Sequence, residues 1–150
     1  MAIKRYYAVK DNTITNAFKE NLATRATGSN MGASDILEVF SIYARQSTGS
    51  SELTRFLVEF DLTGSANTPK SDRTDGLLAA SGSVKWYLRI FNAKHSRTVP
   101  REYYLMASPV SKQWDEGTGL DMDEYSDHVG GNKGSIWLRR GSPAQLIILV

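Results

Sequence analysis

Three aspartates in the last third of the chain have the spacing of a metal site. Asp121, Asp123 and Asp127 occupy positions 1, 3 and 7 of a potential calcium loop, and Ca²⁺ prefers such oxygen ligands. An EF-hand also needs Gly at its sixth and Glu at its twelfth position, where this chain has Ser126 and Asn132. These two departures exclude an EF-hand. They leave an irregular Ca²⁺ site as the one metal or cofactor that the sequence suggests.

Residues suited to catalysis are sparse. The chain has no Cys and only two His, His95 and His128, so disulfides and thiolate zinc sites are excluded. It contains neither Gly-x-Ser-x-Gly nor Gly-x-x-x-x-Gly-Lys-Ser/Thr, the motifs of a nucleophilic serine and a phosphate-binding loop. We predict that the chain has no catalytic residues and is not an enzyme.

Aromatic side chains could bind sugars, because flat rings stack on the apolar faces of pyranoses. The candidates are Trp86, Trp114, Trp137, Tyr6, Tyr7, Tyr87, Tyr103 and Tyr104. Core packing is the alternative, and it is the interpretation favoured for Trp86 and Trp114. Three or more coplanar rings on one exposed face would favour sugar binding instead.

Charge is distributed unevenly along the chain. The net charge is +2, but residues 113–127 contain six acids and no base, which leaves 18 basic against 10 acidic residues, or +8, elsewhere. This segment fits contact with a basic neighbour, with Asp121, Asp123 and Glu124 as interaction residues, although solvation is the simpler interpretation. The bases form no stripe that would indicate nucleic-acid binding, and no apolar run approaches the roughly 20 residues that span a membrane.

These groups must be positioned mainly by β-strands. Between Leu53 and Phe60 the side chains alternate, with Phe56 on the cleaner apolar face. Further strands are expected at 6–17 with a break at Asp11-Asn12, and at 35–44, 84–91, 103–110, 135–138 and 144–150. Residues 63–83 are expected to form a long flexible loop or arm, and 113–134 an acidic, Gly-rich loop. The prediction is one all-β domain over residues 1–150, an antiparallel β-sandwich of jelly-roll type.

Arg55 stands out as a base within the most regular strand pattern. We expect it to be half-buried and paired with Asp61 or Glu59, because a buried guanidinium needs an acceptor. Its role would be structural.

Five short motifs follow one another along residues 6–118. They are Asp11 with Thr13-Ile14, Asn30-x-Gly32 with Leu37-x-Val39, Ser51…Arg55…Phe60-Asp61, Trp86-x-Leu88-x-Ile90, and Val110-x-x-x-Trp114-x-Glu116-Gly117. In order and spacing they resemble the β-sandwich domains of the DNRLRE type, which are related to carbohydrate-binding modules. After Gly117 the chain departs from the family pattern, although Trp137 could take the place of a later tryptophan.

The tracts 91–96 and 119–125 look like marine phage structural proteins of this type. The resemblance implies a non-enzymatic virion protein of a tailed phage, either a capsid decoration or cement protein or a head, neck or tail accessory protein. Such a protein would assemble in the host cytoplasm, contact other virion proteins and form homo-oligomers. The alternative that the resemblance implies is a carbohydrate-binding module that attaches the particle to a host surface glycan.

Overall fold

The structure is a computed structural model that describes residues 3–19, 21–39, 41–43, 51–79, 82–94, 96, 102, 104–110, 113–120 and 134. The chain divides into two compact units: unit 1 comprises residues 1–9 and 60–101, and unit 2 comprises residues 10–59 and 102–150. The single domain stays a prediction. Several predicted features lie outside the described residues, namely the strands at 135–138 and 144–150, Trp137, Tyr103, His95, His128, Asp121, Asp123, Glu124 and Asp127.

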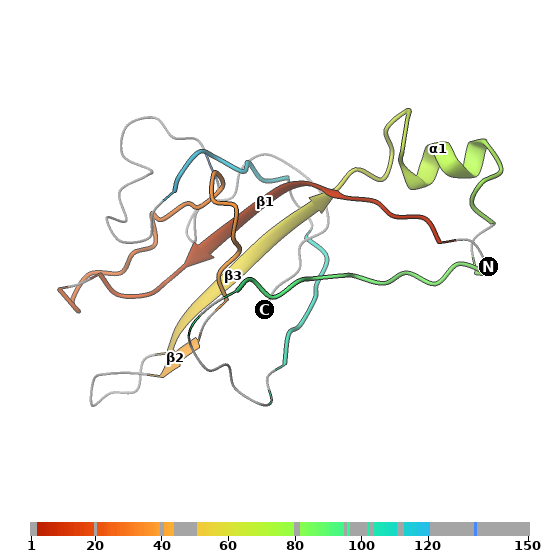
Figure 1. The fold of residues 1–150 in the computed structure, drawn as a ribbon. Helices are drawn as coiled ribbons and strands as arrows, with labels where there is room; N and C mark the ends of the chain where they lie inside the picture. Colours follow the sequence, from red (N-terminus) through yellow and green to blue (C-terminus); the bar gives the residue numbers. More distant parts are fainter. Residues whose placement is uncertain are drawn as a thin grey trace. The chain divides into compact units, whose positions relative to one another are not determined.

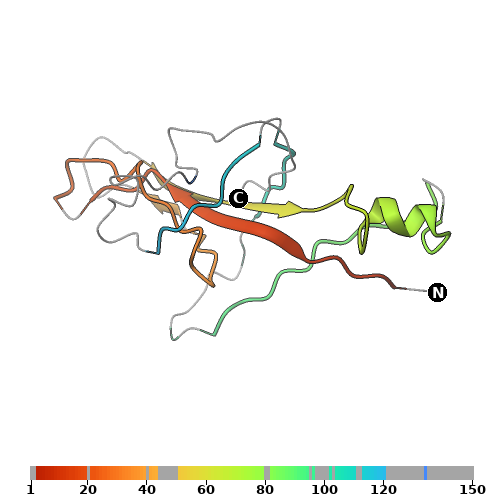
Figure 2. The same ribbon diagram turned by 90° about the horizontal axis from the view of Figure 1, so that it is seen from above.

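Three strands form one sheet in the order β1-β3-β2. They are β1 (Ala8–Thr15), β2 (Ser41–Tyr43) and β3 (Ser51–Phe60). β2 pairs with β3 in the antiparallel sense, in a register that places Ser41 opposite Leu53. Figures 1 and 2 both show β1 and β3 side by side, with their arrowheads at opposite ends. Regular structure in the described residues is thus mostly strand, consistent with the all-β prediction.

β3 confirms the strand that the alternation predicted. Phe56, Leu57 and Val58 are consecutive, and all three are buried. Because successive side chains of a strand point to opposite faces, both faces of β3 are covered at its centre. The sequence predicted only one clean apolar face, so β3 is buried more completely than expected.

β1 runs without the predicted break at Asp11-Asn12. The Asn12 side chain is buried in the strand, and its Oδ1 accepts a hydrogen bond of 2.9 Å from Met31 N. A buried amide needs such a partner, and this one is satisfied without interrupting the strand. The predicted break is therefore wrong.

The end of β1 is joined to β3 partly by side chains. Thr15 Oγ1 donates to the Leu53 carbonyl oxygen at 3.0 Å, and Leu53 N donates to Asn16 Oδ1 at 2.7 Å. Asn16 N also donates to the Leu53 carbonyl oxygen, at 3.2 Å. These bonds extend the pairing of the two segments beyond the last residue of β1.

Three predicted strands are shortened or not formed in the described residues. β2 covers Ser41–Tyr43 of the strand predicted at 35–44. Earlier in that segment, Glu38 N donates to Thr13 Oγ1 at 3.1 Å. The described parts of 84–91 and 103–110 are also not assigned as strand. Residues 84–91 nevertheless run as an extended chain in Figure 1 (green). The sequence pattern of a strand is present there, but no strand pairing joins this segment to other described residues.

A short helix, α1 (Pro69–Thr74), lies within the segment predicted as a flexible loop. Thr68 Oγ1 accepts from Ser71 N at 3.2 Å, and Ser71 Oγ accepts from Thr68 N at 3.0 Å. This reciprocal pair is a capping box, and Pro69 fits the first turn because its fixed φ suits a helix start. The prediction of a flexible loop is therefore wrong over Pro69–Thr74.

The hydrophobic cluster of unit 2 consists of Ile14, Leu57 and Trp114, with Val110 packed against it. Trp114 is 2% exposed, so its predicted core position is confirmed. Trp86, in unit 1, is 55% exposed, and its predicted core position is wrong. The alternation around Trp86 indicated an apolar face but did not indicate what would cover it.

The two tryptophans provide a matched pair of substitutions. Trp114→Ala removes a buried ring and should lower the free energy of unfolding by about 3–5 kcal/mol. Trp86→Ala removes the same ring from an exposed position and should cost less than about 1 kcal/mol. Guanidinium unfolding followed by circular dichroism measures both. Equal losses would contradict the position of Trp114 in the core.

Candidate functional site

The side-chain amide of Asn30 joins two loops of unit 2. Asn30 is 1% exposed. Its Nδ2 donates to the Glu116 carbonyl oxygen at 2.8 Å, while its Oδ1 accepts from Gly32 N at 3.1 Å and from Gly119 N at 3.0 Å. The amide therefore holds segments that are more than 80 residues apart in the sequence, and we call this contact the Asn30 junction.

Glycines permit the close backbone approach at the Asn30 junction. A Cβ atom at Gly32 would overlap the Glu116 carbonyl group, and one at Gly119 would overlap the Asn30 carbonyl group. Gly117 has a φ of +81°, in the region that glycine adopts most readily. The motif residues Asn30-x-Gly32 and Glu116-Gly117 thus lie in contact, which their separation in the sequence did not reveal.

Two carboxyl groups lie next to the Asn30 junction. Asp11 N donates to Glu116 Oε1 at 2.8 Å. Burial raises the pKa of the Asp11 carboxyl, and the negative charge of Glu116 raises it further. Ca²⁺ takes 6–8 oxygen ligands, and no group of three or more potential metal ligands occurs among the described residues. The Asp11–Glu116 pair therefore does not by itself make a metal centre.

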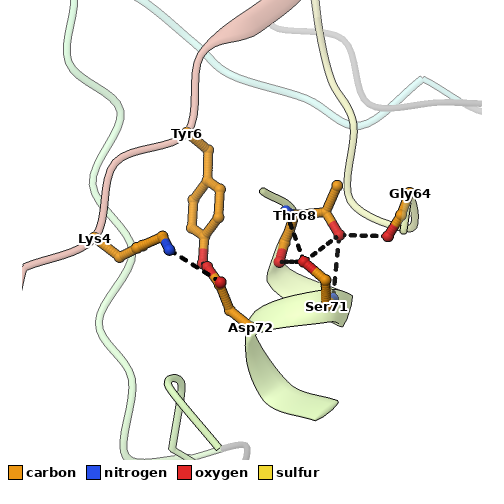
Figure 3. A network of polar contacts seen from close by, with 6 residues as sticks. All are labelled: Lys4, Tyr6, Gly64, Thr68, Ser71 and Asp72. Carbon is orange, nitrogen blue, oxygen red and sulfur yellow. Dashed lines mark hydrogen bonds and ion pairs between the residues drawn. The ribbon is translucent and has the colours of Figure 1, made fainter. Parts of the chain in front are cut away.

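In unit 1, the carboxylate of Asp72 binds two residues of the N-terminal segment (Figure 3). Tyr6 Oη donates to Asp72 Oδ2 at 2.6 Å, and Lys4 Nζ lies 3.0 Å from Asp72 Oδ1. Asp72 is buried on α1, next to the capping box of Thr68 and Ser71. These contacts attach residues 4–6 to the helix, and we call them the Asp72 network.

The electrostatics of the Asp72 network suit attachment better than proton transfer. Burial, together with the hydrogen bond to Asp72 and the negative charge of its carboxylate, raises the pKa of Tyr6 from 10.0 to about 12. The hydrogen bond from Tyr6 lowers the pKa of Asp72, as does the one from Lys4. A general acid or base works best with a pKa near the ambient pH, whereas these shifts move both groups away from neutrality.

An exposed apolar segment, residues 84–91, extends from Val84 to Phe91 in unit 1. Its exposed large side chains are Trp86, Tyr87, Leu88, Ile90 and Phe91. The Trp86 and Tyr6 rings have centroids 6.1 Å apart and are tilted by 36°, and the Arg89 guanidinium lies 4.6 Å from the centre of the Phe91 ring. The apolar segment is the clearest candidate in the described residues for a surface that contacts another molecule.

Arg55 and Asp61 have separate surroundings. Arg55 is half-buried on β3, as predicted, and has an interaction partner. Asp61 is exposed, and its Oδ1 accepts from Thr63 N and Gly64 N in the turn after β3. Glu59 accepts from Lys10 Nζ at 3.2 Å. The pairing of Arg55 with Asp61 or Glu59 stays a prediction.

Sequence reasoning missed the Asp72 network and the linking role of Asn30. A signal for the first was present in Thr68-Pro69-x-Ser71, which marks a helix start. No local signal indicates that Tyr6 would reach Asp72, 66 residues later.

None of the described helices is long and apolar enough to cross a membrane.

No protein-family model, no curated protein and no solved structure matches this chain.

The Asn30 junction predicts a large loss of stability on truncation. Asn30→Ala leaves the N–H groups of Gly32 and Gly119 and the Glu116 carbonyl without this partner, which should cost about 2–5 kcal/mol in total. Asn21→Ala is the control, because Asn21 also bonds nearby backbone N–H groups but is exposed. Its loss should be below about 1 kcal/mol. Denaturant unfolding compares the variants, and equal stability of the two would contradict the junction.

The Asp72 network predicts a loss of stability at alkaline pH. A group with a raised folded-state pKa contributes stability that is complete below its unfolded value and is lost as the pH rises through its folded value. For Tyr6 this window extends from 10.0 to about 12. Wild type should therefore lose more stability across it than Tyr6→Phe, as measured by urea unfolding. The difference in phenolate absorbance between the two proteins should titrate with a midpoint near pH 12. A midpoint near pH 10 would refute the contact between Tyr6 and Asp72.

The Asp72 network also predicts a loss of stability at acid pH. Because the pKa of Asp72 is lowered, its contribution is present above its unfolded pKa of about 4 and is lost as the pH falls through the folded value. Asp72→Asn should flatten this acid loss, whereas Asp75→Asn, an exposed acid after the same helix, should not. Identical acid profiles for wild type and Asp72→Asn would be the contrary result.

Proposed function

We propose that this chain is a non-enzymatic structural protein of a tailed-phage virion, acting through protein–protein contacts as a capsid decoration or cement protein or as a head, neck or tail accessory protein. The observation that carries the proposal is the apolar segment 84–91. It has the alternation of a buried strand, yet on its apolar face Trp86 is 55% and Ile90 54% exposed. A partner would cover these side chains in the assembled particle.

Exposed apolar area costs free energy in water. Burying such area is worth roughly 25 cal/mol per Å², and an extended segment also carries backbone N–H and C=O groups that can pair with another strand. A protein whose role is to hold others together would bury both on assembly. We infer that the apolar segment gains its strand pairing in the particle.

The Asn30 junction supports the family part of the proposal. The motifs that carry the resemblance to DNRLRE-type β-sandwich domains include Asp11, Asn30-x-Gly32 and Glu116-Gly117, and these residues contact one another. Motifs that were matched separately along the sequence thus belong to one structural unit. The sandwich of jelly-roll type is part of this proposal, and the cover on both faces of β3 is in keeping with it.

Glycan attachment is the second candidate, and the exposed Trp86 ring beside Tyr6 favours it. The tilt of 36° between these rings means that the two do not form one flat platform. Trp114 is buried and cannot contribute. Binding of wild type but not of Trp86→Ala to an array of bacterial surface glycans would support this second function.

The virion proposal is tested on purified particles. Antibody against the chain should label particles in immunogold electron microscopy, and the protein should co-purify with them through a density gradient. Trp86→Ser with Ile90→Ser should reduce incorporation about tenfold or more, since losing two anchors in one contact costs at least about 1.4 kcal/mol. Leu77→Ser, an exposed apolar residue outside the segment, is the matched control. Absence of the protein from purified particles would overturn the proposal.

A further inference from the structure

We propose that the apolar segment 84–91 docks on a second copy of this chain, in a head-to-tail contact with the acidic segment 113–127 of that copy. This inference rests on the proposed function and names its partner. The contact would combine apolar burial with paired opposite charge.

Charge complementarity within the sequence identifies the partner. Residues 76–101, which contain the apolar segment, carry five bases and no acid, while residues 113–127 carry six acids and no base. The two segments are therefore matched in sign and closely matched in charge. Complementary potentials of this kind speed association and fix its register.

Two bases of the apolar segment and one that follows it are available for such a contact. Lys85, Arg89 and Lys94 are exposed. Within the part of the chain that the structure describes, the ion pairs involve Lys4 and Lys10, and none involves these three bases. Arg89 stacks over the Phe91 ring, which places positive charge directly beside exposed apolar area.

The acidic segment also offers both kinds of group in its described part. Asp115 is exposed, and Leu120 is an exposed apolar residue in the same segment. Leu120 thus lies among acids, whereas the apolar side chains of residues 84–91 lie among bases. The two surfaces thus share one chemical pattern with opposite sign.

A head-to-tail arrangement follows from these charges. Two copies joined through residues 76–101 of each would bring five bases of one copy against five of the other, and like charges repel. Joining the basic segment of one copy to the acidic segment of the next avoids this repulsion. Each pair of copies then keeps one basic and one acidic segment to which further copies can bind. Such heterologous contacts generate rings or filaments, which suits a protein present in many copies.

Reciprocal charge reversal tests the proposal by sedimentation velocity over a range of protein concentrations and salt. Wild type should form oligomers at low salt and dissociate in about 1 M salt, where the Debye length is about 3 Å. Lys85→Glu, Arg89→Glu and Lys94→Glu together should give a monomer, and so should Asp121→Lys, Asp123→Lys and Glu124→Lys. Mixing the two reversed proteins should restore oligomers, because opposite charges again meet. Lys70→Glu with Arg73→Glu, on exposed positions of α1, should associate as wild type does.

The outcomes separate this inference from the proposed function. A wild type that is monomeric at every concentration, or reversed proteins that remain monomers when mixed, would overturn the second copy as partner. A contact of the two segments within one chain would give that monomeric result. The proposed function is decided by particle incorporation, so a monomeric protein that still enters particles would leave it standing, with a different virion protein on the apolar segment.

Discussion

A buried side-chain amide has to find partners for both its oxygen and its nitrogen, and Asn30 meets this requirement by joining two distant loops. An amide left unpaired in the interior would cost free energy comparable to a lost hydrogen bond. The loop from Asn30 to Gly32 and the loop from Glu116 to Gly119 can therefore occupy few relative positions. The position of the 113–120 segment against β1, through the bond between Asp11 N and Glu116, depends on this junction.

The described interior contains other polar side chains besides Asn30. Among the described residues, the largest side chains that are almost wholly buried are polar: Asn12, Asn30, Thr13, Thr15, Thr54, Thr68 and Ser29. Hydrogen bonds of this kind specify geometry but contribute only about 1 kcal/mol each to net stability. Large apolar residues such as Trp86 and Ile90 are meanwhile exposed. In the described residues, polar contacts thus fix the local shape while several large apolar side chains stay exposed.

How far the sequence predicted this structure depends on the range of each interaction. β3 and the core position of Trp114 could be predicted, since a regular strand pattern and a large ring carry strong local signals. The cap of α1 was also readable from Thr68 to Ser71, although the segment was predicted as a loop. Asn30 and Asp72 could not be predicted as links, because their partners lie far away in the sequence. The predicted core position of Trp86 was wrong for a related reason. Alternation identifies an apolar face of a strand, whereas tertiary contacts decide what covers that face.

The apolar segment 84–91 could complete a sheet in its own chain or add to a neighbouring copy, and the backbone and apolar side chains favour both arrangements equally. Unpaired N–H and C=O groups accept any strand of suitable direction, and burial of apolar area is not directional. Charge restricts this cover to an acidic surface, because residues 76–101 around the apolar segment carry five bases and no acid. In this chain the polar interior determines the shape of each unit, and the uneven charge determines what the apolar segment can accept as its cover.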